Sequence, residues 1–277
     1  MDCGAGRDAV MGNNTKIVVN ADDFGMSHEK NVAIDSLMRS GVCTNTSLVI
    51  NMPYTEEAVR MAFDGGYQDK VSLHLNLTVG ESLSTKIREV SLYYADGKFA
   101  YRPIIKINKQ VYPKYVRVVR EELEAQIKAF LNYGFTLKGI DSHNWVHLRV
   151  PVWMALKPLI RKYKIPIVRP MWEGYKRPEI ASLKWSRYFR LFQPVLLRCR
   201  QCRVLGYTSN IEQFLVDEKK AGQCEFVEVF THPDMIDGQN IDTSSSYLGK
   251  PKDCVVNNVR LIDAYEKVSI AQILEEC

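Results

Sequence analysis

The chain has 277 residues, of which 46% are hydrophobic, and its 37 basic and 32 acidic side chains give a net charge of +5. This length and apolar content suit one α/β domain of barrel size or two small domains. The excess of positive charge is too small to indicate a nucleic-acid partner, and without a run of about 18 apolar residues the sequence gives no reason to expect a membrane span.

The cysteines and the N-terminal segment indicate in which cellular compartment the protein is expected. Seven cysteines are scattered along the chain, and the odd number without regular spacing argues against a disulfide scaffold and for a reducing compartment. Residues 1–14 are small and polar and lack the apolar stretch of a signal peptide. We therefore expect a disordered leader over 1–14, a single domain over 15–277 and a cytoplasmic location.

Apolar runs alternate with helical patterns along the chain. A β-branched run predicts a strand over 17–20, and the apolar spacing that follows predicts a helix over 30–40, ended by Gly41. The further elements in chain order are a strand over 45–51, a helix over 56–63, a strand over 71–77, a helix over 117–133, a strand over 139–141, a helix over 151–163, and strands over 166–169 and 226–230. Such alternation predicts a mostly parallel sheet, and six or more units fit a (β/α) barrel better than an open sheet.

Acidic and histidine side chains lie where these predicted strands end. The residues in question are Asp22, Asp23, His74, Asp141, Ser142, His143, Thr231 and His232, with His147 shortly after. In a parallel barrel the carboxyl ends of the strands meet at one rim, so we expect these side chains to converge. Only one of the five histidines, His28, lies elsewhere, near the start of a helix.

Two imidazoles and a carboxylate form a common divalent-metal site with open positions for water and substrate. A second carboxylate beside it can act as a general base, and two adjacent aspartates on a strand end cannot both point the same way. Each residue also has a simpler explanation: Asp22 as a helix cap, His74 as a core histidine, His143 in a turn, and His147 and His232 as surface or loop residues. Their joint placement at strand ends favours a site.

Four sequence blocks carry a resemblance to a known family. They are KIVVNADDFG, VSLHLNLTVG, GIDSHNWVH and VEVFTHPDMID, and the last three match the patterns G-x-H-x-N-L-T-x-G, D-S-H-x-H-x-H and C-H-P. With these blocks and their spacing, the chain resembles the YdjC-like carbohydrate deacetylase family over residues 16–275. The resemblance implies a distorted, TIM-like (β/α) barrel related to polysaccharide deacetylases. It also implies metal-dependent hydrolysis of the N-acetyl group of an amino sugar.

The resemblance further implies roles for individual residues. Asp23, His74 and His143 would hold one divalent ion, magnesium or zinc. Asp22 would be the general base, and His232 the acid or the group that stabilises developing charge. Arg169 would lie near the site, where it could orient a carboxylate or bind sugar oxygens. His147 is a further expected substrate contact.

This chain departs from the family pattern beside the proposed metal ligands. Trp145 stands where the third block has another histidine, and Asn144 fills a position that is often histidine or glutamine. Trp145 could stack on a sugar ring or pack beneath the rim. The stretch 206–210 also matches the family pattern poorly. These departures affect the sugar contacts and leave the three proposed ligands intact.

Several features leave other interpretations open. The basic, aromatic stretch 184–203 predicts an amphipathic outer helix more than a nucleic-acid or membrane surface, and its CxxC, Cys199 and Cys202, is incidental without partner cysteines. The long segment 82–114, with a turn at Asp96 and Gly97, could cover the sugar site or contact a second subunit in a homodimer. The alternative functions are a metal-dependent hydrolase of another bond such as a phosphoester, a non-catalytic sugar-binding protein, and a nucleic-acid or structural partner.

Overall fold

The computed structural model describes residues 14–100, 113–170, 198–243 and 253–276. The predicted leader over 1–14 therefore lies outside the described residues except for its last position. Most of the basic stretch 184–203 and part of the segment 82–114 also lie outside them. Within the described part of the chain, no helix is both long and apolar enough to cross a membrane.

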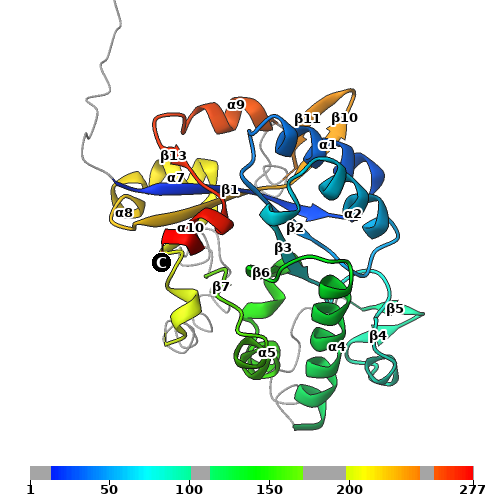
Figure 1. Cartoon of the computed structure of the whole chain (residues 1–277). Coiled ribbons are helices and arrows are strands. Elements are labelled where there is room, and N and C mark those ends of the chain that lie inside the picture. The colour runs from blue at the N-terminus through cyan, green and yellow to red at the C-terminus, as the bar shows by residue number, and fades with distance from the viewer. Residues whose placement is uncertain (1–13, 101–112, 171–197, 244–252, 277) are drawn as a thin grey trace, which may run out of the picture.

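A curled sheet of parallel strands lies at the centre of the molecule (Figure 1). Its strands follow the order β7-β6-β3-β2-β1-β9-β8, and the short β13 pairs with β1. Their bounds are β1 Lys16–Phe24, β2 Asn45–Leu48, β3 Val71–Leu75, β6 Gly139–Ser142, β7 Ile167–Val168, β8 Tyr207–Asn210, β9 Phe226–Thr231 and β13 Glu266–Lys267. The parallel sheet confirms the predicted α/β, barrel-like class. Between β7 and β8 no ladder is formed by the described residues, so the barrel is open there.

Helices alternate with the strands, and their apolar sides are buried. The bounds are α1 His28–Arg39, α2 Thr55–Asp64, α4 Pro113–Asn132 and α5 Val150–Lys162, all within a few residues of the predicted helices. The long α4 packs against α5 (Figure 1). Its buried side chains Val119, Leu123, Ile127 and Phe130 recur at helical spacing. Helix α1 begins after Ser27, whose hydroxyl accepts a hydrogen bond from the backbone N–H of Lys30 at 3.2 Å.

The predicted turn at Asp96 and Gly97 is confirmed. It joins β4 (Tyr94–Ala95) to β5 (Lys98–Phe99), an antiparallel pair, and both turn residues have positive φ. The strands β10 (Pro233–Ile236), β11 (Gln239–Asp242) and β12 (Asp253–Cys254) and the helices α7 (Ile211–Val216), α8 (Glu218–Ala221), α9 (Val255–Arg260) and α10 (Ile270–Glu276) were not predicted. They are all short, so they show little periodicity.

The interior of the curled sheet is filled in layers. An apolar cluster occupies one end and contains Val18, Ile167, Leu205, Phe226 and Ile270. A small cavity is lined both by members of this cluster and by the polar side chains of Asn20, Ser72, Asp141, Arg169 and Glu228. Because Val18, Asn20 and Asp22 alternate along β1, they follow one another on one face of the strand. The polar layer therefore lies between the apolar cluster and the carboxyl ends of the strands.

Candidate metal centre

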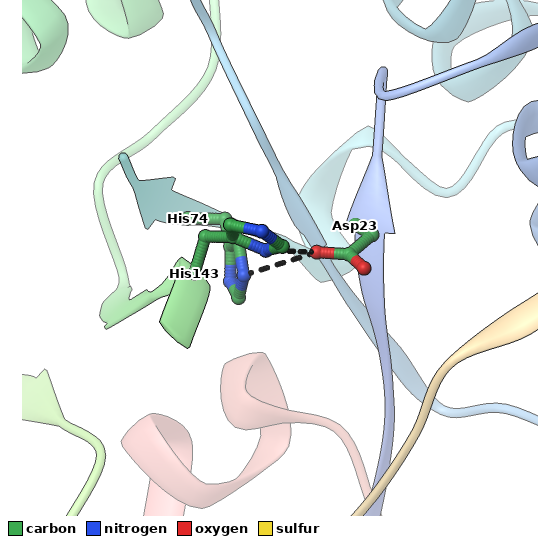
Figure 2. Close-up of side chains that lie close together, drawn as sticks. All are labelled: Asp23, His74 and His143. Carbon is green, nitrogen blue, oxygen red and sulfur yellow. Dashed lines mark hydrogen bonds and ion pairs between the residues drawn. The ribbon is translucent and has the colours of Figure 1, made fainter. Parts of the chain in front are cut away.

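Three side chains from different strand ends meet at the carboxyl edge of the sheet. Asp23 lies near the end of β1, His74 lies in β3, and His143 directly follows β6. Figure 2 shows both imidazoles turned toward the same carboxylate oxygen, Asp23 Oδ1. His143 Nδ1 is 2.8 Å and His74 Nε2 is 3.4 Å from this oxygen. The sequence could place these residues at strand ends, and the structure brings them together.

The backbone of β1 separates the two adjacent aspartates. The register between β1 and β2 shifts between Ala21 and Phe24, and Asp23 has a φ of 73°, a conformation that costs a non-glycine residue on the order of 1 kcal/mol. Gly25 follows with a φ of 91°, and a Cβ there would lie 2.8 Å from the carbonyl oxygen of Val49. As expected, Asp22 and Asp23 face different partners.

His74 has the arrangement of a metal ligand that is oriented by a carboxylate behind it. Its Nδ1 lies 2.7 Å from Asp141 Oδ1, whereas Nε2, on the side of Asp23, is buried and has no hydrogen-bond partner among the described residues. An Nδ1–H donated to Asp141 leaves the Nε2 lone pair for a cation. Burial opposes a charge on this ring, but Asp141, with Asp23 and Asp22, raises the pKa of His74 to about 10. The carboxylates that favour a proton on the ring also favour a divalent cation in its place.

Asp23, His74 and His143 therefore fit a divalent ion, since their ligand atoms all lie within 4.8 Å of one another. A second group with the same spacing is Asp22, His74 and Asp141. We favour the first group because the guanidinium of Arg169 already binds Asp22 and Asp141 in the second. The donors do not distinguish magnesium from zinc, since imidazole suits zinc and carboxylate suits both.

Asp22 is held by Arg169 through two parallel hydrogen bonds. Arg169 Nη1 donates to Asp22 Oδ2 and Nη2 to Asp22 Oδ1, both at 2.7 Å, and Asn20 Nδ2 donates to Oδ1 at 2.6 Å. Burial would raise the pKa of the Asp22 carboxyl, but the charge and hydrogen bonds of Arg169 outweigh it and lower the pKa to about 2. Asp22 is therefore an oriented, ionised carboxylate beside the metal group.

Arg169 was expected either to orient a carboxylate or to bind sugar oxygens, and its position corresponds to the first. The side chain is 2% exposed, and it contacts Asp22, Asp141 at 2.6 Å and Glu228 at 2.8 Å. Three carboxylates thus surround one guanidinium. Because the guanidinium is buried among them, it is not accessible to a ligand that arrives from solvent. A direct sugar contact, which was the second expectation, does not fit this placement.

His147 is likewise placed inside the protein and away from a substrate surface. It is fully buried, its Nδ1 lies 2.5 Å from the hydroxyl of Ser142, and its Nε2 lies 3.1 Å from the carbonyl oxygen of Arg169. Burial, with the nearby charge of Arg169, lowers the pKa of His147 to about 4, so the ring is neutral at pH 7. The expected sugar contact from His147 therefore does not fit this placement either, and its hydrogen bonds hold the backbone of Arg169.

His232 lies beside Asp22, and Trp145 lies beside Phe230 and Arg169. His232 Nε2 is 3.7 Å from Asp22 Oδ2, and the side chain is 22% exposed. Trp145 is partly buried, with its ring 5.4 Å from that of Phe230 and 5.4 Å from Arg169 Cζ. Asn144 and Trp145 both have positive φ, 52° and 55°, directly after His143, the expected ligand. Trp145 thus packs against Phe230 and Arg169 and stays partly exposed.

Sequence reasoning missed the supporting roles of Asp141 and Glu228. Asp141 was expected among the side chains that converge on the rim but was given no role, and the structure places it behind His74. Glu228 is a single charged residue among the apolar side chains of β9, and that interruption was the one signal that could have identified it. Neither the partner of Glu228 nor that of Asp141 can be inferred from spacing, because Arg169 directly follows β7 and His74 lies on β3.

Asp141→Asn is expected to weaken the binding of a divalent ion by about 10–100-fold, the usual effect of losing a group that orients a ligand. The amide no longer offers the charged oxygen that fixes the Nδ1–H of His74. Equilibrium dialysis of chelator-stripped protein against zinc or magnesium measures the change. Asp69→Asn is the control, since Asp69 is exposed and pairs with Lys138. Unchanged affinity in Asp141→Asn would contradict this role.

The family model described as YdjC-like protein matches residues 16–260. Relatives described as carbohydrate deacetylases include those of Oceanobacillus iheyensis and Brevibacillus brevis, each 28% identical over 84% of this chain and covering 91% and 86% of the relative. Another, from Clostridium beijerinckii, is 33% identical over 55% of this chain and 59% of the relative. A crystal structure from Enterococcus faecalis V583, described as a candidate cellobiose-phosphate cleavage protein, shares the fold with a TM-score of 0.63, 23% identity and 95% coverage of both chains.

Proposed function

The chain belongs to the YdjC-like protein family, and we propose that it is a metal-dependent carbohydrate deacetylase. It hydrolyses the N-acetyl group of an amino sugar or a short oligosaccharide of the N-acetylglucosamine type and releases acetate. The observation that carries the proposal is the ionised Asp22, oriented by Arg169, beside a group of one aspartate and two histidines. The relatives described as carbohydrate deacetylases support the choice of substrate class.

Asp23, His74 and His143 would hold one divalent ion, magnesium or zinc. When bound, the ion supplies Lewis-acid polarisation of the acetamide carbonyl and lowers the pKa of water. The protein residues fix where this happens, because Asp141 holds His74 through Nδ1 and the left-handed backbone of Asp23 turns its carboxylate toward both rings.

Asp22 acts as the general base. Its carboxylate is ionised and lies beside the proposed metal group, where it would accept a proton from the attacking water. The paired hydrogen bonds from Arg169 keep the carboxylate from rotating, so its oxygens keep one direction relative to the metal group.

His232 acts as the acid toward the leaving amine. Its ring is partly exposed and lies 3.7 Å from Asp22, so it can reach a substrate bound over Asp22. Transfer of a proton from this ring to the amine nitrogen completes cleavage of the amide bond, leaving acetate and a free amino sugar.

Trp145 contacts the sugar ring through its exposed edge. Trp145→Ala is expected to raise KM about tenfold and to leave kcat within a few-fold, because a contact made equally in the ground and transition states affects binding alone. Trp145→Phe keeps an aromatic face, so its KM should lie between those of the wild type and Trp145→Ala. Steady-state kinetics on N-acetylglucosamine oligomers measure both constants. A fall in kcat with unchanged KM would show that Trp145 only packs beneath the rim.

Product analysis tests the proposed reaction. The metal-loaded protein is incubated with N-acetylglucosamine oligomers, and acetate and free amine are quantified separately. Equal amounts of both products are expected. Release of phosphate from sugar phosphates without acetate would instead support the phosphoester hydrolase. Saturable sugar binding without any product would support the non-catalytic sugar-binding protein.

The place of action and the assembly also belong to the proposal. A cytoplasmic location is supported by the five cysteines of the described residues, Cys43, Cys199, Cys202, Cys224 and Cys254, all of which are free thiols. The homodimer considered for the segment 82–114 stays a prediction, which light scattering of the purified protein tests by measuring its mass. The function requires neither nucleic acid nor a membrane.

A further inference from the structure

Glu228 is a buried carboxylate that the reaction outlined above does not use. It lies in β9 between Val227 and Val229, and its exposed fraction is 2%. A carboxylate in such a position requires compensation by a cation or by hydrogen bonds. Its partners therefore indicate why the strand carries it.

The partners of Glu228 are Arg169 and Thr208. Arg169 Nε donates to Glu228 Oε2 at 2.8 Å, and Nη2 donates to Oε1 at 3.2 Å. The hydroxyl of Thr208 in β8 donates to Oε2 at 2.9 Å. Glu228 thus binds the Nε edge of the guanidinium, while the edge formed by Nη1 and Nη2 binds Asp22.

The guanidinium of Arg169 is planar, so the direction of one edge fixes the direction of the other. A side chain held along one edge presents its other edge in one fixed direction. β9 and β8 therefore determine, through Glu228 and Thr208, how Arg169 meets Asp22 on β1. Without Glu228, the arginine would keep its contacts to Asp22 and Asp141 but would lose the hydrogen bonds from Nε and Nη2 to Glu228.

A contribution to the stability of the fold alone explains the pair of Glu228 and Arg169 less well than a positioning role does. Burial raises the pKa of Glu228, and although Arg169 opposes this, the neighbouring Asp141 and Asp22 add to the rise. Three carboxylates around one guanidinium repel one another, and an apolar side chain at this position would avoid that cost. Retention of the carboxylate is better explained by the orientation it imposes.

We propose that Glu228 is a positioning residue, which fixes the guanidinium of Arg169 so that it holds Asp22 in the orientation needed for proton transfer. The catalytic part of the proposal rests on the proposed function, in which Asp22 is the base. The orientation of Arg169 itself does not depend on which bond is cleaved, so the two parts can be tested separately.

The first test measures the mobility of Arg169 by NMR of the arginine side-chain nitrogens. We expect separate, slowly exchanging Nη–H signals for Arg169 in the wild type, and averaged or broadened signals in Glu228→Gln. Glu122→Gln is the matched control, because Glu122 is an equally buried carboxylate that binds the backbone N–H groups of Leu83 and Ser84. Unchanged Arg169 signals in Glu228→Gln would overturn the proposal.

Thr208→Val supplies a milder variant if Glu228→Gln does not fold. It removes the hydroxyl that holds Glu228 Oε2 without removing the carboxylate. The same broadening, smaller in extent, is expected. Sharp, separate signals in a folded Thr208→Val protein would show that the orientation of Arg169 does not depend on this side of the network, which contradicts the proposal.

The second test is kinetic. Glu228→Gln should lower kcat about 10–100-fold, as changes of orienting groups do, with KM and metal affinity unchanged within about twofold. In an Arg169→Lys background, Glu228→Gln should have little further effect, because the residue acts through Arg169. Full additivity of the two changes would overturn the proposal. If no amide is hydrolysed by the wild type, the proposed function fails, and the NMR result still decides the positioning role.

Discussion

Asp22→Asn is expected to lower kcat for deacetylation by about 10²–10⁴-fold, the usual contribution of a general base, while one divalent ion still binds. The asparagine amide is nearly the same size as the carboxylate but cannot accept a proton from water. The three proposed ligands are unchanged, since Asp22 faces Arg169 and Asp23 faces the histidines. The expected result is therefore a folded, metal-loaded and inactive protein.

The control for this variant is Asp69→Asn, an exposed position remote from the site, which should keep full activity. Acetate release gives the rate, and elemental analysis of the dialysed protein gives the metal content. Turnover of Asp22→Asn within tenfold of the wild type would remove Asp22 from the role of base. Loss of metal from the same variant would instead place the ion in the alternative group of Asp22, His74 and Asp141.

His74→Ala and His143→Ala are each expected to weaken metal binding by more than about 100-fold, beyond the effect of losing an orienting group. Both rings face Asp23, and each substitution removes one of the two imidazole donors of the proposed metal centre. In the wild type, an ion at 100 times its Kd should stabilise the fold by about 2.7 kcal/mol. Neither variant should show this stabilisation under the same conditions.

Thermal unfolding with and without added ion measures the difference, and isothermal titration gives the affinity. His28→Ala is the matched control, because His28 is an exposed histidine on α1 that pairs with Glu57. It should keep both the affinity and the rise in Tm. If both single variants, His74→Ala and His143→Ala, still bound one divalent ion tightly, the proposed metal centre would be excluded.

The parts of the fold that could be predicted are those with long periodic patterns. The helices α4 and α5 bury side chains at a regular helical spacing, so their existence followed from the sequence, whereas β1 is buried at every position after Lys16 and was predicted from its β-branched run. The strand β8 was missed because its residues are polar, and only the structure shows that they are buried and that Thr208 donates to a carboxylate on β9. The local pattern of residue types in a sequence does not indicate such contacts between strands.

The same distinction applies to the site. Asp23, His74 and His143 could be placed at one rim because parallel strands end at the same edge of the sheet. The placement of Arg169 could not be predicted, since its partners Asp22, Asp141 and Glu228 lie on three other strands, far away in the sequence. The left-handed backbone at Asp23 could not be predicted either, because aspartate adopts a positive φ more often than most residues but still uncommonly.

The central claim is that the group of Asp23, His74 and His143 binds a divalent ion needed for the hydrolysis of an acetylated amino sugar. The most direct test is acetate release from N-acetylglucosamine oligomers by protein that is stripped with a chelator and then resupplied with single divalent metals. We expect no release from stripped protein and recovery with zinc or magnesium, abolished by Asp22→Asn. Equal release with and without metal, or no release from any acetylated sugar by fully metal-loaded protein, would contradict the claim.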